Sequence, residues 1–110
     1  MKRILNSSAR PTAVMASNDL TAIGAMGAIA EAGLRVPQDI SVVGYDDIQL
    51  SAFTMPPLTT VSLPRAEIAN AAFRALLNDQ RVDAKKTVQC EENMIQPTFV
   101  RRKSTGPARC

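Results

Sequence analysis

Two short apolar segments on either side of a helix-like stretch constrain the fold of this chain most strongly. The first, residues 13–16, ends in polar residues that favour turns and helix caps. The second, residues 40–45, is apolar on both faces, as strands of a parallel sheet are. Together with the stretch between them they have the usual length of a strand–helix–strand unit, about 30 residues. We therefore expect an α/β fold with a right-handed crossover and a parallel sheet.

The stretch between these strands predicts a helix of about 13 residues that is apolar all round. Gly33 stands where a left-handed C-terminal cap would end it. A helix of this kind needs cover on both sides, from a sheet on one side and from its own chain or a second subunit on the other. One apolar face consists of Leu20, Ile23, Gly27, Ala30 and Leu34.

The rest of the chain predicts shorter elements and connectors. Pro56 and Pro57 remove two backbone donors, which favours a connector between subdomains over a central strand at residues 56–61. Pro64 suits the first position of a helix, which we expect to end near residues 78–79. The other expected elements are the end of a helix at 1–5, strands at 87–90 and 98–100, and a loose tail at 104–110.

The composition excludes several kinds of active site. The 110 residues include no histidine, which removes histidine-dependent nucleophilic triads and histidine-liganded zinc. Cys90 and Cys110 fit reduced thiols better than a disulfide framework. No apolar run has the length of a signal peptide core or a membrane span. We expect a cytoplasmic chain that is not an enzyme, has no catalytic residue, metal or cofactor, and does not contact a membrane.

Basic residues gather at the two ends of the chain and account for most of its net charge of +3. Neither aromatic residues nor a helical repeat accompany them, so we interpret them as solvated tails and not as a nucleic-acid surface. They are Lys2, Arg3, Arg10, Arg101, Arg102, Lys103 and Arg109.

Polar side chains follow both predicted strands. Asn18 and Asp19 follow the first strand, and Asp46 and Asp47 follow the second. Ligands of open parallel sheets bind at this edge, and carboxylate and amide groups can hold the adjacent hydroxyls of a sugar. Helix capping at the first position, a plain turn at the second, and an acid/base pair or divalent-metal site remain alternatives. No glycine motif of a phosphate site precedes the helix.

Several motifs agree in order and spacing along nearly the whole chain. They are PTAV at 11–14, SNDL at 17–20, AIGA at 22–25, AGLRVPQDISVVGYDD at 32–47, PPLTTV at 56–61 and RKST at 102–105. Together they resemble the LacI/GalR family of bacterial transcription regulators.

The resemblance implies a periplasmic-binding-protein-like sensor fold, of which this chain would be an incomplete fragment. Residues 1–61 would form the second half of the C-terminal effector-binding subdomain. Residues 62–96 would belong to the N-terminal subdomain, and residues 97–110 would form a return strand and tail. The partners implied are a small effector, a sugar or nucleoside-like molecule, a second subunit in a homodimer, and operator DNA bound through a headpiece absent from this chain.

The resemblance also assigns roles to residues. Effector binding maps to Asn18, Asp19 and Asp46. The dimer interface maps to Ile23, Met26 and Gly27 on the doubly apolar helix. Leu63 departs from the pattern, because members often carry a polar effector-contacting residue at this point. A periplasmic sugar-binding protein of an ABC transporter, which shares the fold, is the alternative function, and an enzyme is the third.

Overall fold

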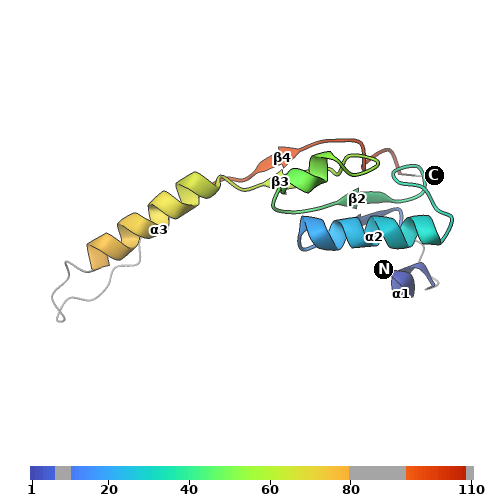
Figure 1. The fold of residues 1–110 in the computed structure, drawn as a ribbon, viewed down its shortest axis with the longest axis horizontal. Helices are drawn as coiled ribbons and strands as arrows, with labels where there is room; N and C mark the ends of the chain where they lie inside the picture. The colour runs from blue at the N-terminus through green and yellow to red at the C-terminus, as the bar shows by residue number, and fades with distance from the viewer. Residues whose placement is uncertain (7–10, 80–93, 109–110) are drawn as a thin grey trace. The chain divides into compact units, whose positions relative to one another are not determined.

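The computed structural model describes residues 1–6, 11–79 and 94–108. The chain divides into two units, residues 1–62 with 98–110, and residues 63–97. Figure 1 shows the elements, which follow the order α1 (Lys2–Leu5), β1 (Ala13–Met15), α2 (Asp19–Glu31), β2 (Ser41–Val43), the 3₁₀ helix η1 (Gln49–Ala52), β3 (Thr60–Ser62), α3 (Arg65–Asp79) and β4 (Thr98–Val100).

The predicted strand–helix–strand unit is present. β1 and β2 pair in parallel, with Val14 opposite Val42. α2 connects the two strands and lies alongside β2 (Figure 1). The prediction of a parallel α/β arrangement is therefore confirmed.

The ends of α2 also agree with the sequence pattern. The Asn18 Oδ1 atom accepts a hydrogen bond of 2.8 Å from the Thr21 N–H, so Asn18 is the N-cap. Gly33 has a φ of 73°, which places it in the left-handed region and allows the chain to leave the helix. These two local signals set the length of α2.

The core of the larger unit lies between α2 and the sheet. Ala22, Met26 and Ile29 lie on one face of α2 and are part of a buried cluster that includes Val42. The face that begins at Leu20 is only partly covered, because Leu20 is 65% exposed whereas Ile23 and Leu34 pack against the edge of the core. Helical spacing identified two apolar faces, and the structure buries the one that carries Ala22, Met26 and Ile29 most deeply.

β3 corrects the expectation that residues 56–61 do not contribute to a central strand, because their last two residues, 60 and 61, belong to β3. β3 pairs with β4 in antiparallel orientation, with Val61 opposite Phe99. On its other side the Gly44 N–H donates to the Thr59 carbonyl at 2.9 Å. The strand therefore has neighbours on both sides. β3 begins at Thr60, after both prolines. The backbone N–H groups that Pro56 and Pro57 lack are therefore not needed for hydrogen bonds to the neighbouring strands.

The segment after β4 corrects the prediction of a loose tail at residues 104–110. Ser104 is fully buried. Its hydroxyl accepts a hydrogen bond from the Thr59 N–H at 2.7 Å and donates to the Val42 carbonyl at 2.6 Å. The Gly106 N–H donates to the Ser41 hydroxyl at 3.0 Å. Residues 104–106 thus fasten β2 to the segment that leads into β3.

The second unit contains α3, which begins after Pro64 and ends at Asp79, as predicted. The Ile68 N–H donates to the Pro64 carbonyl at 3.0 Å. Several apolar side chains of α3 are exposed, with Phe73 at 62%. The predicted strand at 87–90 and both cysteines lie outside the described residues. No helix among the described residues is long and apolar enough to cross a membrane.

Candidate functional site

The turn that follows β2 has an unusual backbone. Asp46 and Asp47 have φ angles of 109° and 52°, values that residues other than glycine rarely adopt. Residues in such conformations cost of order 1–3 kcal/mol each and persist only where surrounding contacts impose them. The contacts around this turn therefore determine where its side chains lie.

Asp19 holds the turn from the side of α2. Its side chain is fully buried, and its Oδ2 atom accepts a hydrogen bond of 2.8 Å from the Ile48 N–H. Its Oδ1 atom accepts a hydrogen bond from the Thr60 hydroxyl. Its backbone N–H donates to the Tyr45 carbonyl at 2.8 Å. Asp19 therefore joins the start of α2 to both ends of the turn and to β3.

Gly44 is required by this arrangement. A Cβ atom at this position would overlap Asp19 Oδ1 and lie 3.0 Å from a methyl carbon of Leu58. Only a residue without a side chain lets the strand pass so close to the buried carboxylate.

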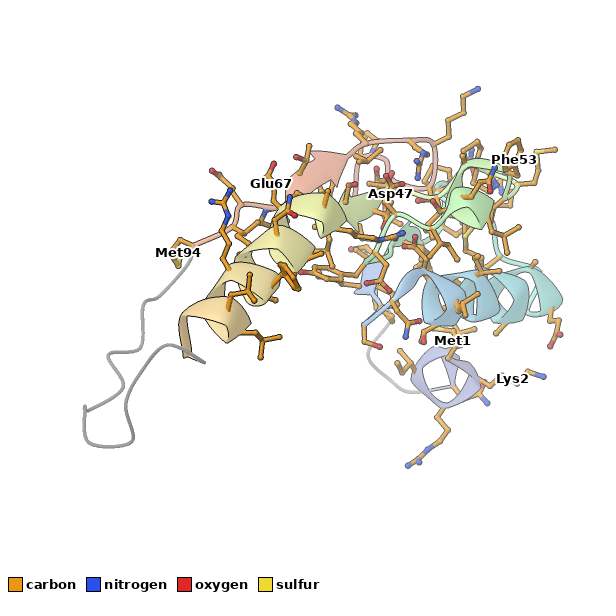
Figure 2. The ribbon with its side chains drawn as sticks, turned by 60° about the vertical axis from the view of Figure 1, so that its left-hand side comes forward. Met1, Lys2, Asp47, Phe53, Glu67 and Met94 are labelled. Carbon is orange, nitrogen blue, oxygen red and sulfur yellow. The ribbon has the colours of Figure 1, made fainter. Side chains whose placement is uncertain are left out.

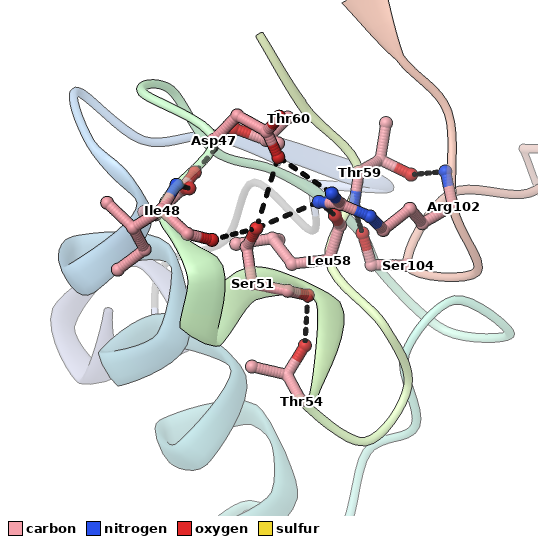
Figure 3. A network of polar contacts seen from close by, with 10 residues as sticks. Asp47, Ile48, Ser51, Thr54, Leu58, Thr59, Thr60, Arg102 and Ser104 are labelled. Carbon is pink, nitrogen blue, oxygen red and sulfur yellow. Dashed lines mark hydrogen bonds and ion pairs between the residues drawn. The ribbon is translucent and has the colours of Figure 1, made fainter. Parts of the chain in front are cut away.

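Arg102 holds the turn through the side chain of Asp47 (Figure 3). Its Nη2 atom donates to Asp47 Oδ1 at 2.7 Å, and its Nη1 atom donates to the Ser51 hydroxyl at 2.8 Å and to the Leu58 carbonyl at 2.9 Å. The side chains of Arg102 and Asp47 are only 20% and 23% exposed. The interpretation of Arg102 as a solvated tail charge was therefore wrong.

The ion pair changes the acidity of Asp47. The hydrogen bond from Arg102 holds the pKa of the Asp47 carboxyl below its ordinary value, while burial acts in the opposite direction. Hydrogen bonds from Ser62 and Ser51 and the charge of Arg102 lower the pKa further. Asp47 is thus kept as a carboxylate by its partners.

The predicted effector residues lie at one edge of the sheet, the carboxyl ends of β1 and β2. Asn18 precedes α2 and is half-buried. Asp19 is hydrogen-bonded through its backbone to the residue that precedes Asp46. Asp46 is half-buried, and its N–H donates to the Val61 carbonyl at 2.9 Å. The geometry therefore gathers the three residues, and it leaves Asp19 with its carboxylate already engaged by two donors.

The predicted interface residues occupy different positions on α2. Met26 is 7% exposed and packs in the core. Ile23 is half-buried against the core, whereas Gly27 is exposed, with nothing within 4 Å of an added Cβ atom. Figure 2 shows a separate apolar side chain, Phe53, which follows the end of η1 and is 75% exposed.

A hollow of about 520 Å³ lies beside β1 and is lined by residues of α1, β1 and α2. Its lining includes Ser17 and Thr21 but none of the three predicted effector residues. Among residues 1–6, 11–79 and 94–108, no group of three His, Cys, Asp or Glu side chains is placed to hold a metal ion.

Pattern analysis missed three residues that hold the turn or the carboxylate of Asp19, namely Ser51, Thr60 and Arg102. Nothing in local periodicity marks them, because each has a partner more than 40 residues away in the chain. The available signals were the PPLTTV motif at 56–61, which contains Thr60, and the RKST motif at 102–105, which contains Arg102.

A sequence profile of the periplasmic binding protein-like domain family matches residues 1–105. The chain belongs to this family. The fold predicted from the motifs is thereby confirmed.

The relatives and solved structures that this chain is similar to include transcription regulators. The HTH-type transcriptional repressor PurR of Salmonella arizonae is 43% identical over 111 residues, which cover 99% of this chain and 32% of that protein. A crystal structure of the lac repressor dimer bound to operator and the anti-inducer ONPF has a TM-score of 0.77 and 41% identity, covering 94% of this chain and 35% of that one.

A third comparison is a LacI family transcriptional regulator from Enterococcus faecium with bound ribose. It has a TM-score of 0.78 and 33% identity, and the match covers 98% of this chain and 38% of that one. This chain therefore spans about a third of the length of the relatives it matches. The resemblance to the LacI/GalR family is confirmed, and the relatives are transcriptional repressors and not transport proteins.

Proposed function

We propose that this chain is the effector-sensing and dimerising part of a LacI-type DNA-binding transcriptional repressor that acts in the cytoplasm and is not an enzyme. The observation that carries the proposal is the 43% identity to a transcriptional repressor over 99% of the chain. Operator DNA would be bound by a headpiece outside these residues. A periplasmic sugar-binding protein is disfavoured, because the relatives described above are repressors.

The effector we propose is a sugar or nucleoside-like molecule held at the carboxyl edge of the sheet. Asp46 would contact its hydroxyls directly, since a carboxylate accepts from two adjacent hydroxyls at once. Asn18 lies at the same edge and would supply an amide. Asp19 would contribute through the turn, because its carboxylate is occupied by Ile48 and Thr60. The bound ribose of the Enterococcus faecium regulator supports this class of ligand.

The effector test uses the full-length protein that contains these residues. Calorimetric titration with D-ribose, sucrose, adenosine and inosine identifies a ligand. Asp46→Asn keeps the shape of the side chain and tolerates a positive φ, but removes the charge. We expect it, like Asp46→Ala, to weaken binding by about 1–3 kcal/mol, the value of a charge-assisted hydrogen bond.

The matched control is Glu31→Gln, which removes an exposed carboxylate at the opposite end of α2. The Glu31→Gln protein should bind the effector with the same affinity as the unchanged protein. If Asp46→Asn also binds with unchanged affinity, Asp46 is not part of the site.

The second subunit would pack on the exposed apolar face of α2. Gly27 and Ile23 would lie at this interface, and Met26 would support them from the core side of the helix. Gly27→Arg tests this interface, because Gly27 is exposed and a Cβ atom added there has no neighbour within 4 Å. Sedimentation equilibrium should show a shift from dimer to monomer. Gln38→Arg, at an exposed position before β2, should leave the dimer intact.

The gene sequence upstream of Met1 distinguishes the regulator hypothesis from the transport hypothesis without any protein purification. A helix-turn-helix and basic hinge encoded upstream of Met1 agree with a repressor. A secretory leader there would replace the proposal with the transport function.

A further inference from the structure

Arg102 lies where three segments meet, and each of them accepts a hydrogen bond from its guanidinium. The acceptors are the Asp47 carboxylate in the turn, the Ser51 hydroxyl in η1 and the Leu58 carbonyl before β3. Its own N–H donates to the Thr59 hydroxyl at 3.0 Å. The residue is thus fixed through its backbone while its side chain reaches across to the turn.

We propose that Arg102 is a positioning residue, whose guanidinium imposes the backbone of the Asp46–Asp47 turn and thereby sets the position of the Asp46 carboxylate. The turn needs such a restraint, because both residues have a positive φ. The effector part of the proposal rests on the function proposed above. The conformational part stands on the contacts alone.

Three sets of contacts restrain the turn. Asp19 fixes its ends, through the Tyr45 carbonyl and the Ile48 N–H, and the Asp46 N–H donates to the Val61 carbonyl of β3 at 2.9 Å. Arg102 fixes the side chain of Asp47, since it donates to Asp47 Oδ1 at 2.7 Å, whereas the contact from Ser51 to the same oxygen is 3.5 Å long. Figure 3 shows the Arg102 side chain extending from beside Thr59 to Ser51 and Asp47.

Arg102 also reaches the far end of the turn through a second hydrogen bond. The Ser51 hydroxyl that accepts from its guanidinium donates in turn to the Ile48 carbonyl at 2.7 Å. A planar guanidinium can serve three acceptors in fixed directions, and a lysine ammonium cannot reproduce that fork. Removing the fork should therefore loosen the turn while Ser104 still fastens β2 and β3 to the C-terminal segment.

The experiment compares Arg102→Lys with Arg101→Lys in the full-length protein. Arg101 is the adjacent residue of the same type and is exposed. The first readout is hydrogen–deuterium exchange of single amides. In Arg102→Lys we expect the Asp46 and Ile48 amides to exchange about tenfold faster or more, the loss expected for one charge-assisted hydrogen bond. The Val42 and Ala16 amides of the sheet should keep their rates.

A double-mutant comparison assigns the effect to the ion pair. Asp47→Asn should accelerate exchange of the same amides, and adding Arg102→Lys should bring little further change. Equal acceleration at Val42 and Ile48 would show that Arg102 only stabilises the fold, and unchanged exchange at Ile48 would show that it does not restrain the turn. Either result overturns the proposal.

The second readout is the affinity for the ligand found among D-ribose, sucrose, adenosine and inosine. Arg102→Lys should raise its Kd about tenfold through displacement of Asp46, and should add little to Asp46→Asn. Arg101→Lys should leave the Kd unchanged. Normal affinity in Arg102→Lys would overturn the effector part. If the unchanged protein binds none of the four compounds, the proposed effector class fails, and the exchange data still decide the role of Arg102 in the turn.

Discussion

Two carboxylates at the same edge of the sheet are held in different ways. Asp19 is fully buried and accepts hydrogen bonds from two uncharged donors, a backbone N–H and a hydroxyl. Asp47 is 23% exposed and is paired with a charged guanidinium. A buried acceptor is costly to lose because its donors are left without water, whereas a partly exposed pair can be replaced in part by solvent. Asp19 therefore serves mainly the stability of the fold, and Asp47 serves mainly the shape of the turn.

The largest effect should follow from removing the buried carboxylate. Asp19→Ala leaves the Ile48 N–H and the Thr60 hydroxyl without their acceptors. We expect the free energy of unfolding to fall by about 2–4 kcal/mol, from two unsatisfied buried donors. Urea denaturation followed by circular dichroism measures this loss. Asp19→Asn keeps one acceptor oxygen and should lose less. If Asp19→Ala lowers the free energy of unfolding no more than Asp47→Asn does, the two carboxylates do not differ in their importance for the fold.

A smaller loss should come from crowding the same carboxylate. Gly44→Ala places a Cβ atom against Asp19 Oδ1 and near Leu58. Overpacking of this kind costs about 1–3 kcal/mol. The same substitution in the Asp19→Ala background should cost less, because the overlapping atom is gone, and a thermodynamic cycle from urea denaturation measures the difference. Equal costs in the two backgrounds would show that Asp19 is not the obstacle.

The Asp47 pair should give a pH-dependent contribution. Because the folded pKa of Asp47 is lowered, its stabilisation is fully present above the unfolded value of about 3.9 and is lost as pH falls through the folded value. We expect Asp47→Asn to cost roughly 1–2 kcal/mol at pH 7 and progressively less below pH 4. Denaturation of both proteins across this range provides the test. If the free energies of unfolding of the unchanged protein and Asp47→Asn differ by the same amount at all pH values, the ion pair does not contribute as proposed.

The smallest effect should come from the cap. Asn18→Ala removes the acceptor of the Thr21 N–H at an exposed helix end, where water can replace it. The expected loss is about 1 kcal/mol. Asn18→Asp keeps the acceptor and should restore stability in the same urea experiment. A loss as large as that of Asp19→Ala would show that the start of α2 has one shared restraint and not two.

Much of the fold could be predicted because its signals are local. The apolar runs of β1 and β2, the cap at Asn18 and the positive φ at Gly33 all act within a few residues. The prolines at 56–57 misled the prediction for β3, because the pattern shows a missing donor but not whether a neighbouring strand needs it. Within the candidate site, the sequence predicted that Asn18, Asp19 and Asp46 lie at one edge of the sheet, because residues that follow parallel strands meet at the carboxyl ends of those strands.

The order of residues by itself indicated where β1, α2 and β2 lie, and it carried the motifs that identify the family. Only the tertiary structure decided which apolar face of α2 meets the sheet, and that Arg102 binds Asp47, 55 positions earlier in the chain. The reason is physical. Helical and strand periods report the neighbours of a residue along the chain, whereas this partly buried ion pair depends on which distant segments come together when the core forms.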